Sequence, residues 1–151
     1  MVKLGELLKN VKPETIVQKS ISVGDVLYSK MDLTSGIIPK HGDTFRHKFF
    51  IVLGFDSEGN IYGGLIINSK INQNIPPVYR LYHMPISASK YNFLKYDSFV
   101  DCAQLKTIKL EDYFKWSYVG KIEKNDLDLM INTIKDSPLE KKGNLRRFGL
   151  Q

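Results

Sequence analysis

The sequence predicts a mainly β domain, folded as a small and strongly curled β-barrel with a few helices. Three observations lead to this fold class. Short segments of strand composition recur along the chain, adjacent glycines bend one of them, and an amphipathic helix follows the last. The chain has 151 residues, of which 42% are hydrophobic, so it can bury one core and leaves little room for a second.

Residues 1–22 are predicted to form a helical extension ahead of the barrel. Apolar side chains over residues 3–11 recur at helical spacing, which predicts a short N-terminal helix that ends at Pro13, followed by a connector over 14–22. This region lacks the apolar core of a secretion signal, and the chain has no run of about eighteen apolar residues. A cytoplasmic location without a membrane partner is therefore expected.

The barrel is predicted to cover residues 23–136. Its most secure element is a β-hairpin in which two apolar runs, residues 48–54 and 61–67, flank a turn of polar residues and glycine. Gly63 and Gly64 predict a bulge or a sharp bend in the second run. The other predicted strands are residues 25–31, 78–86, 98–100, 105–110 and 118–122, of which the third and fourth can be one bent strand.

Polar loops and a C-terminal helix complete the predicted domain. The loop over residues 32–47 exceeds about 12 residues, a length at which loops are usually functional, so it is a candidate lid or binding loop. Residues 68–77 form a second polar loop, and residues 87–96 are predicted to be a short helix or loop. The final helix begins at the predicted N-cap Asn125 and ends before Pro138. Its apolar stripe is Leu127, Met130, Ile131 and Ile134.

An SH3-like barrel fits this order of short strands, glycine bends and one closing helix best. The remaining residues 137–151 are basic and are expected to be a solvated tail. The whole chain carries 22 Lys and Arg against 16 Asp and Glu, a net charge of +6, and such a surface attracts phosphates. Cys102 is the only cysteine and is expected to be a small buried hydrophobe. With one cysteine and three widely separated histidines, no metal and no cofactor are expected.

The sharpest chemical feature is a cluster of cations and histidines on one loop and the strand that follows it. Cleavage of RNA without a metal ion needs a base for the 2′-hydroxyl, a cation for the phosphate and an acid for the leaving oxygen. Histidine titrates nearest to neutral pH and suits both proton transfers. A solvated surface is the alternative interpretation, and His83 is expected to be a packing residue on a strand face. The cluster consists of Lys40, His41, Arg46, His47 and Lys48.

Five short segments also carry a resemblance to a known family. They are Gly24-Asp25, residues 48–53, Ile67-Asn68-Ser69, Pro76-Pro77 and residues 98–108 before the final helix. In this order, and over residues 23–136, the chain resembles the MazF/PemK/Kid family of toxin-like ribonucleases. The resemblance implies an SH3-like barrel that acts as a homodimeric, metal-independent, sequence-specific endoribonuclease and is held inactive by an antitoxin.

The resemblance places the family's catalytic arginine and threonine at Lys48 and Asn68. Lysine keeps the positive charge but lacks the planar guanidinium that grips a phosphate with two hydrogen bonds. Asparagine can donate a hydrogen bond to a phosphate oxygen but has no hydroxyl. Arg46 and His47 are adjacent to Lys48 and are predicted to supply the missing functions. The predicted RNA-binding residues are Lys40, His41, Ser69, Lys70 and Asn72.

The leading interpretation is a toxin-like endoribonuclease, active or degenerate, with single-stranded RNA, an antitoxin and a second copy of the chain as partners. One alternative is a non-catalytic SH3-like barrel that binds a partner protein or a nucleic acid. Another is a growth regulator that acts on a protein target through the same barrel, as the related gyrase poisons do. Aromatic candidates for stacking on unpaired bases, each with a core role as the alternative, are Tyr79, Tyr82, Tyr91, Phe93 and Trp116.

Overall fold

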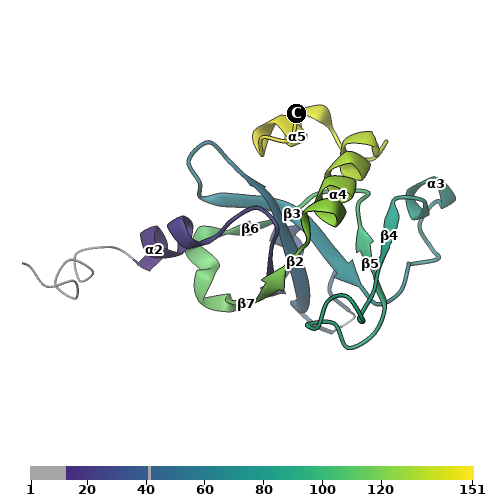
Figure 1. Cartoon of the computed structure of the whole chain (residues 1–151), viewed down its shortest axis with the longest axis horizontal. Coiled ribbons are helices and arrows are strands. Elements are labelled where there is room, and N and C mark those ends of the chain that lie inside the picture. The colour runs from purple at the N-terminus through teal and green to yellow at the C-terminus, as the bar shows by residue number, and fades with distance from the viewer. Residues whose placement is uncertain (1–12, 41) are drawn as a thin grey trace, which may run out of the picture.

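The fold is a mixed arrangement of helices around one seven-stranded antiparallel sheet (Figure 1). The computed structural model describes residues 13–40 and 42–151, so the predicted helix over 3–11 and the predicted site residue His41 lie outside the described residues. The elements in chain order are α2 (Pro13–Ser20), β1 (Asp25–Met31), η1 (Leu33–Ser35), β2 (Arg46–Phe55), β3 (Ile61–Asn68), α3 (Pro77–Arg80), β4 (His83–Ile86), β5 (Ser98–Asp101), β6 (Lys106–Lys109), η2 (Leu110–Lys115), β7 (Trp116–Lys121), α4 (Lys124–Asp136) and α5 (Lys142–Arg147).

The sheet is open, which corrects the predicted closed barrel. Its strand order is β4-β5-β3-β2-β1-β7, and β6 pairs with β3 beside β5. Two strands therefore share the edge of β3 that faces away from β2. β6 pairs with Ile61–Gly64, and β5 pairs with Ile67–Asn68. Closure would need β7 to pair with β4 or β6, but the chain passes from β6 to β7 through the short helix η2 instead. The two predicted strands over 98–110 are confirmed as β5 and β6.

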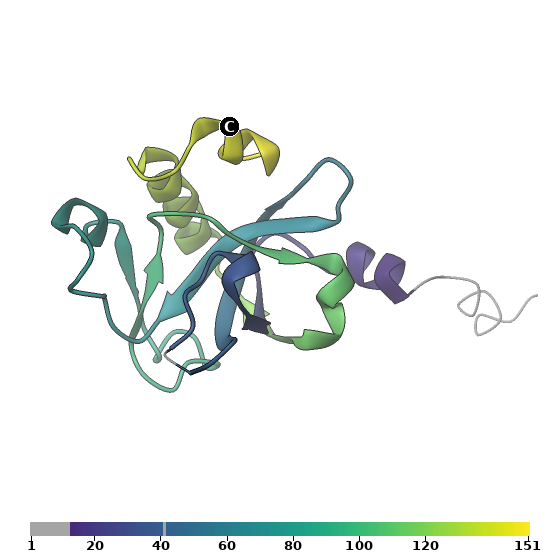
Figure 2. The ribbon, with the colours of Figure 1, turned by 180° about the vertical axis from the view of Figure 1, so that it is seen from behind.

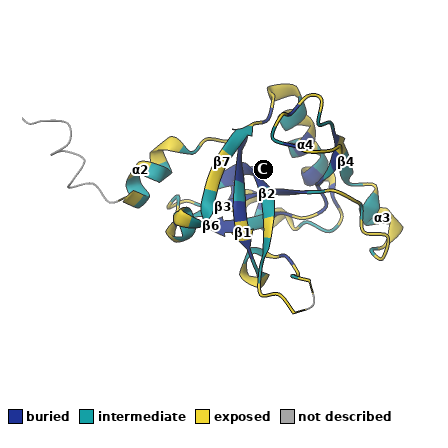
Figure 3. Ribbon diagram, turned by 90° about the horizontal axis from the view of Figure 1, so that it is seen from below, coloured by how far each residue is buried: buried dark blue, intermediate teal, exposed yellow. Residues whose placement is uncertain are grey.

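Two apolar clusters fill the two faces of the sheet, because successive strand residues point to opposite faces. Val26 and Ile51 belong to the first cluster, together with Met130 and Ile134 of α4, as the predicted stripe required. The second cluster lies on the other face, where Val17 of α2 packs against it. Helices α4 and α5 lie on one side of the sheet, and α2 lies beside η2 (Figures 1 and 2). The buried residues are concentrated in the central strands β1, β2 and β3 (Figure 3).

The hairpin of β2 and β3 contains an irregularity opposite the paired glycines, as the sequence predicts. The register shifts between Val52 and Gly54, so β2 carries one residue more than β3 at this point. A Cβ atom on Gly64 would lie 1.9 Å from the carbonyl oxygen of Ile51. A Cβ atom on Gly63 would lie 2.6 Å from the ring of Phe148. Both positions therefore require glycine, because the backbone of β2 lies too close to Gly64 for a side chain and an aromatic ring lies too close to Gly63.

Gly64→Ala is expected to lower the free energy of unfolding by about 2 kcal/mol or more, because the new methyl group can fit only if β2 and β3 move apart. Denaturation by urea measures the change. Gly143→Ala in α5 is the matched control, since its Cβ would meet only one atom, an Arg146 nitrogen at 3.9 Å. Alanine is the better helix former, so this variant should be as stable as the wild type or slightly more so. Equal stability of the two variants would contradict the close-approach explanation.

Three predicted element boundaries are wrong. The connector predicted over 14–22 is mostly helix, because Pro13 begins α2 rather than ending a helix, and proline is tolerated at the first helical position. The strand predicted over 78–86 begins only at His83, because Pro77 starts the short helix α3 in the same way. The predicted N-cap Asn125 lies inside α4, whose N-cap is Glu123.

The predicted solvated tail is instead part of the core. Helix α5 and the residues after it bury Leu145, Phe148 and Leu150 in the first cluster. Ser137 Oγ donates a hydrogen bond to the carbonyl of Ala103 at 2.5 Å, which ties the start of this segment to the sheet. Its basic side chains stay at the surface, so its net charge gave no sign of the buried apolar positions. In the described part of the chain, no helix is both long enough and apolar enough to cross a bilayer.

Candidate functional site

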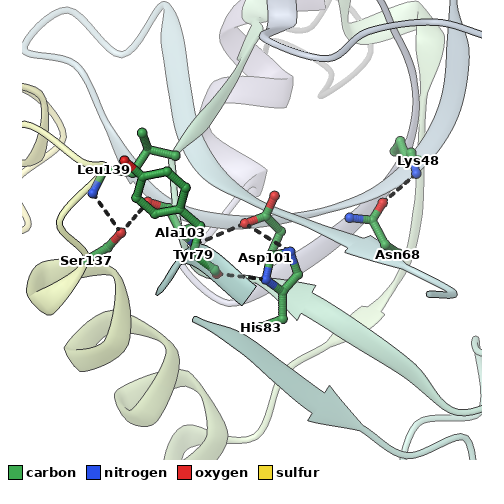
Figure 4. Close-up of polar contacts among 8 residues, drawn as sticks. All are labelled: Lys48, Asn68, Tyr79, His83, Asp101, Ala103, Ser137 and Leu139. Atoms are coloured by element: carbon green, nitrogen blue, oxygen red, sulfur yellow. Dashed lines mark hydrogen bonds and ion pairs between the residues drawn. The ribbon is translucent and has the colours of Figure 1, made fainter. Parts of the chain in front are cut away.

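The two positions singled out by the family resemblance meet at one end of the sheet. β2 and β3 are antiparallel and pair Phe49 with Ile67, so Lys48 and Asn68 are the next opposite residues and share a face. Lys48 Nζ donates a hydrogen bond to Asn68 Oδ1 at 2.6 Å (Figure 4). This bond also orients the Asn68 amide, because the oxygen faces the lysine and leaves the NH₂ group available to another acceptor.

A pocket of about 550 Å³ surrounds this pair. It is called the Lys48 pocket here. Three of the predicted RNA-binding residues, Ser69, Lys70 and Asn72, line it, and so does the predicted catalytic residue Arg46. The segment Gly36 to Ile38 of the predicted binding loop also lines it. Four cations therefore converge on one concave surface, where an anion would be attracted. They are Arg46, Lys48, Lys70 and Lys106.

Burial, together with the positive charges of Arg46 and Lys40, lowers the pKa of the Lys48 ammonium to about 8, against a smaller opposing effect of Asp101. The ordinary pKa of a lysine is 10.5. Lys48 can therefore both hold a phosphate as a cation and release a proton close to neutral pH, which are the two properties required of a catalytic lysine. Lys40 acts on this pocket through its charge and does not line it.

A histidine and an aspartate on neighbouring strands form a second pair in the same pocket. His83 of β4 and Asp101 of β5 are register partners, and His83 Nε2 lies 3.7 Å from Asp101 Oδ1 (Figure 4). His83 Nδ1 lies 3.2 Å from the carbonyl oxygen of Tyr79, which can only accept, so Nδ1 carries a proton. The backbone N–H of Ala103 donates to the same Asp101 oxygen at 3.0 Å and fixes the carboxylate. The His83 side chain is 4% exposed, which agrees with the predicted packing role. His83 also lines the Lys48 pocket, which was not predicted.

The predicted catalytic residue His47 lies on the other face of β2. Strand residues alternate, so Arg46 and Lys48 line the Lys48 pocket and His47 does not. The exposed His47 ring instead lies 5.3 Å from the ring of Tyr28 and 5.4 Å from that of Phe45. His83, Asp101 and Lys106 are the pocket residues that the sequence analysis missed. An aspartate that ends the half-buried strand β5 was the available signal, because a charge in such a strand requires a reason.

The described residues offer no metal site. Among them, no group of three or more His, Cys, Asp and Glu side chains is placed to hold an ion. Cys102 is fully buried, as predicted, and burial raises the pKa of its thiol to about 12, so it stays protonated and unreactive.

No protein-family model matches the chain, and no curated protein matches it at a significant level. The resemblance to the MazF/PemK/Kid family therefore stays a prediction from the residues quoted above. The geometry of the Lys48 pocket is the remaining basis for a function.

The lowered pKa of Lys48 predicts a change in stability with pH. Between about pH 8 and 10.5 the unfolded chain holds a proton that the folded chain has released, so the free energy of unfolding should rise with pH in this window. Lys48→Met removes the titrating group and should remove this rise. Urea denaturation of both proteins at about pH 7, 8, 9 and 10 measures it. A difference between the two proteins that is constant across this range would show that Lys48 titrates normally.

Proposed function

We propose that the chain binds single-stranded RNA in the Lys48 pocket and cleaves it without a metal ion. The observation that carries the proposal is the contact between Lys48 and Asn68 inside a pocket lined by four cations. We also propose that the open sheet is a variant of an SH3-like barrel, in which η2 replaces the strand pairing that would close it. Both statements agree with the family resemblance, and neither depends on the family's own arginine and threonine.

The phosphate would lie between Lys48 and the other cations of the pocket. Arg46 can grip two phosphate oxygens with its planar guanidinium, which restores the geometry that Lys48 lacks. The Asn68 NH₂ group donates to a third oxygen, because the hydrogen bond from Lys48 holds the amide in the required orientation. Lys70 and Lys106 would bind the neighbouring phosphates of the strand.

Cleavage then needs one proton to leave the 2′-hydroxyl and one to reach the leaving 5′-oxygen. The 2′-oxygen attacks phosphorus, its proton passes to His83 Nε2, and Asp101 stabilises the resulting imidazolium. Lys48 gives a proton to the 5′-oxygen as the P–O5′ bond breaks, which its lowered pKa permits. The products are a 2′,3′-cyclic phosphate and a 5′-hydroxyl. Proton transfer back from His83 to Lys48 through solvent resets the site.

The test is incubation of the purified chain with a pool of single-stranded RNAs in the presence of a chelator. The expected result is a set of discrete products that carry 2′,3′-cyclic phosphate and 5′-hydroxyl ends. His83→Gln keeps a polar side chain but cannot act as a base near neutral pH, so it should bind RNA and lose cleavage by about 10²-fold or more. Products with 5′-phosphate ends, or cleavage that the chelator abolishes, would contradict the proposed mechanism.

A second candidate function is RNA binding without cleavage. It is favoured by the surroundings of His83, whose two ring nitrogens both face protein groups, the Tyr79 carbonyl and the Asp101 carboxylate. A histidine held by these two contacts would keep its position and take no part in proton transfer. In that case the same experiment should give tight, salt-sensitive RNA binding and no products.

We further propose a homodimer, as the resemblance implies, with an antitoxin as an additional partner. The apolar stripe of α4 is not available as the dimer surface, because Met130 and Ile134 are buried in the first cluster. The outer edge of β7 is a better candidate surface, since no described strand pairs with it and Tyr118 on it is exposed. Light scattering at micromolar concentration should give the mass of two chains, and the mass of one chain would contradict the dimer.

A further inference from the structure

We propose that a groove of aromatic side chains, on the opposite face of β2 from the Lys48 pocket, holds one unpaired nucleobase of the same RNA strand. This inference rests on the proposed function, because the phosphate bound in the Lys48 pocket delivers the base to the groove. The groove is called the aromatic groove. Its lining residues used below are Tyr28, His47, Phe49, Phe93, Tyr96 and Ser98.

The aromatic groove is continuous with the Lys48 pocket. It consists of two adjoining hollows of about 220 and 400 Å³, which share four lining residues. The smaller hollow is also lined by Arg46, Lys48 and Ser69, and these three residues line the Lys48 pocket as well. A strand of RNA can therefore pass around the start of β2, with its phosphate on one face and a base on the other.

The rings share one face of the sheet because successive side chains along each strand point to opposite faces. Tyr28 of β1 and Phe49 of β2 are register partners, and their ring centres lie 5.0 Å apart. His47 extends the row toward the start of β2, and Phe93 extends it on the other side, 5.3 Å from Phe49. Tyr96 stands at the rim with 61% of its surface exposed. A row of rings that stays open to solvent is the arrangement on which unpaired bases stack.

The neighbours of the rings favour a nucleic acid base over an apolar peptide or a lipid chain. Arg46 lines one end of the groove and Lys95 the other, so a cation is available for the phosphate on each side of a bound base. Of the aromatic residues predicted to stack on bases, Phe93 lines the groove. Tyr91 is buried in the first cluster, and Trp116 packs against the second cluster.

The test measures binding of the full chain to two uncleavable single strands of equal length and charge. One is a mixed-sequence 2′-O-methyl RNA, and the other has the same backbone but no bases. Base stacking is worth about tenfold in affinity for each base, so the wild type should prefer the strand with bases by roughly that factor. Tyr96→Ala should lower affinity for the strand with bases about tenfold and leave affinity for the abasic strand unchanged, while Tyr96→Phe should keep the wild-type preference.

Phe114→Ala is the matched control, because Phe114 is an aromatic residue of η2 that is 71% exposed and lies outside both the groove and the Lys48 pocket. It should change neither affinity. Equal binding of the two strands by the wild type, or a Tyr96→Ala variant that keeps the preference for bases, would overturn the aromatic groove while the phosphate site stands. Failure of the wild type to bind either strand at low salt would overturn the proposed function and the groove with it.

Discussion

Lys48→Ala is expected to lower the rate of RNA cleavage by about 10²-fold or more and to weaken RNA binding. The variant removes the proton donor, one of the phosphate contacts and the group that orients Asn68. It should not lower the free energy of unfolding at pH 7, because a partly buried ammonium that faces other cations costs the folded state energy. Single-turnover cleavage, RNA affinity and urea denaturation together measure these three effects.

Lys109→Ala is the control for Lys48→Ala. Lys109 is an exposed lysine of β6 that does not line the Lys48 pocket, so its removal changes the net charge equally without touching the site. RNA cleavage should stay within about twofold of the wild-type rate, because an exposed charge contributes little at a distance in salt. If both variants lose activity to the same extent, the effect is one of overall charge and the Lys48 pocket is not the site.

Phe148→Ala is expected to lower the free energy of unfolding by about 3–5 kcal/mol, the range for deletion of a buried aromatic ring. The side chain is 2% exposed and lies over Gly63, whose missing Cβ leaves the space that the ring fills. Neither strand can collapse into the resulting cavity, because the backbone of β2 and β3 already meets at Gly64. Thermal and urea denaturation measure the loss.

Arg146→Ala, two residues earlier in α5, is the control for Phe148→Ala. Arg146 is exposed, and an exposed substitution should change stability by less than about 0.5 kcal/mol. A loss of less than about 1 kcal/mol for Phe148→Ala would mean that α5 does not pack on the sheet in solution. RNA binding by the two variants should be equal under conditions where both are folded, because α5 contributes no residue to the Lys48 pocket.

The strands that could be predicted are those whose signal is local. The run of apolar residues in β2, the glycine turn and the return strand β3 identify the hairpin, since each feature lies within the segment that it describes. Pro13 misled the prediction, because a proline can either stop one helix or start another, and the neighbouring residues do not decide between them. Pro77 begins the helix α3, where an extended strand was predicted to follow it. Phe148 was assigned to solvent because its partners Gly54 and Gly63 lie far earlier in the chain.

The candidate site could likewise be predicted only in part, because some of its contacts depend on residues that are distant in the sequence. Lys48 and Asn68 were identified through the order of segments, and the antiparallel pairing of β2 with β3 brings them together. The period of two along β2 places His47 on the face opposite Lys48, so the predicted cluster of adjacent residues is divided between the two faces of the strand. His83 and Asp101 could not be joined in advance, because their contact depends on which strand pairs with β5, and the predicted strand over 78–86 had the wrong start.

The division of the core into two clusters gives the molecule two units of different local stability. The second cluster takes its buried members from the sheet, η2 and the loop residue Ile37, and α2 packs against it, while the first is completed only when α4 and α5 dock. Undocking of α5 exposes part of the first cluster but leaves β2, β3 and every lining residue of the Lys48 pocket in place. Amide hydrogens of α5 should therefore exchange through a partial opening, well before those of the central strands. Within the described residues, a protease should then cut near residues 137–142, and the nicked chain would keep the Lys48 pocket.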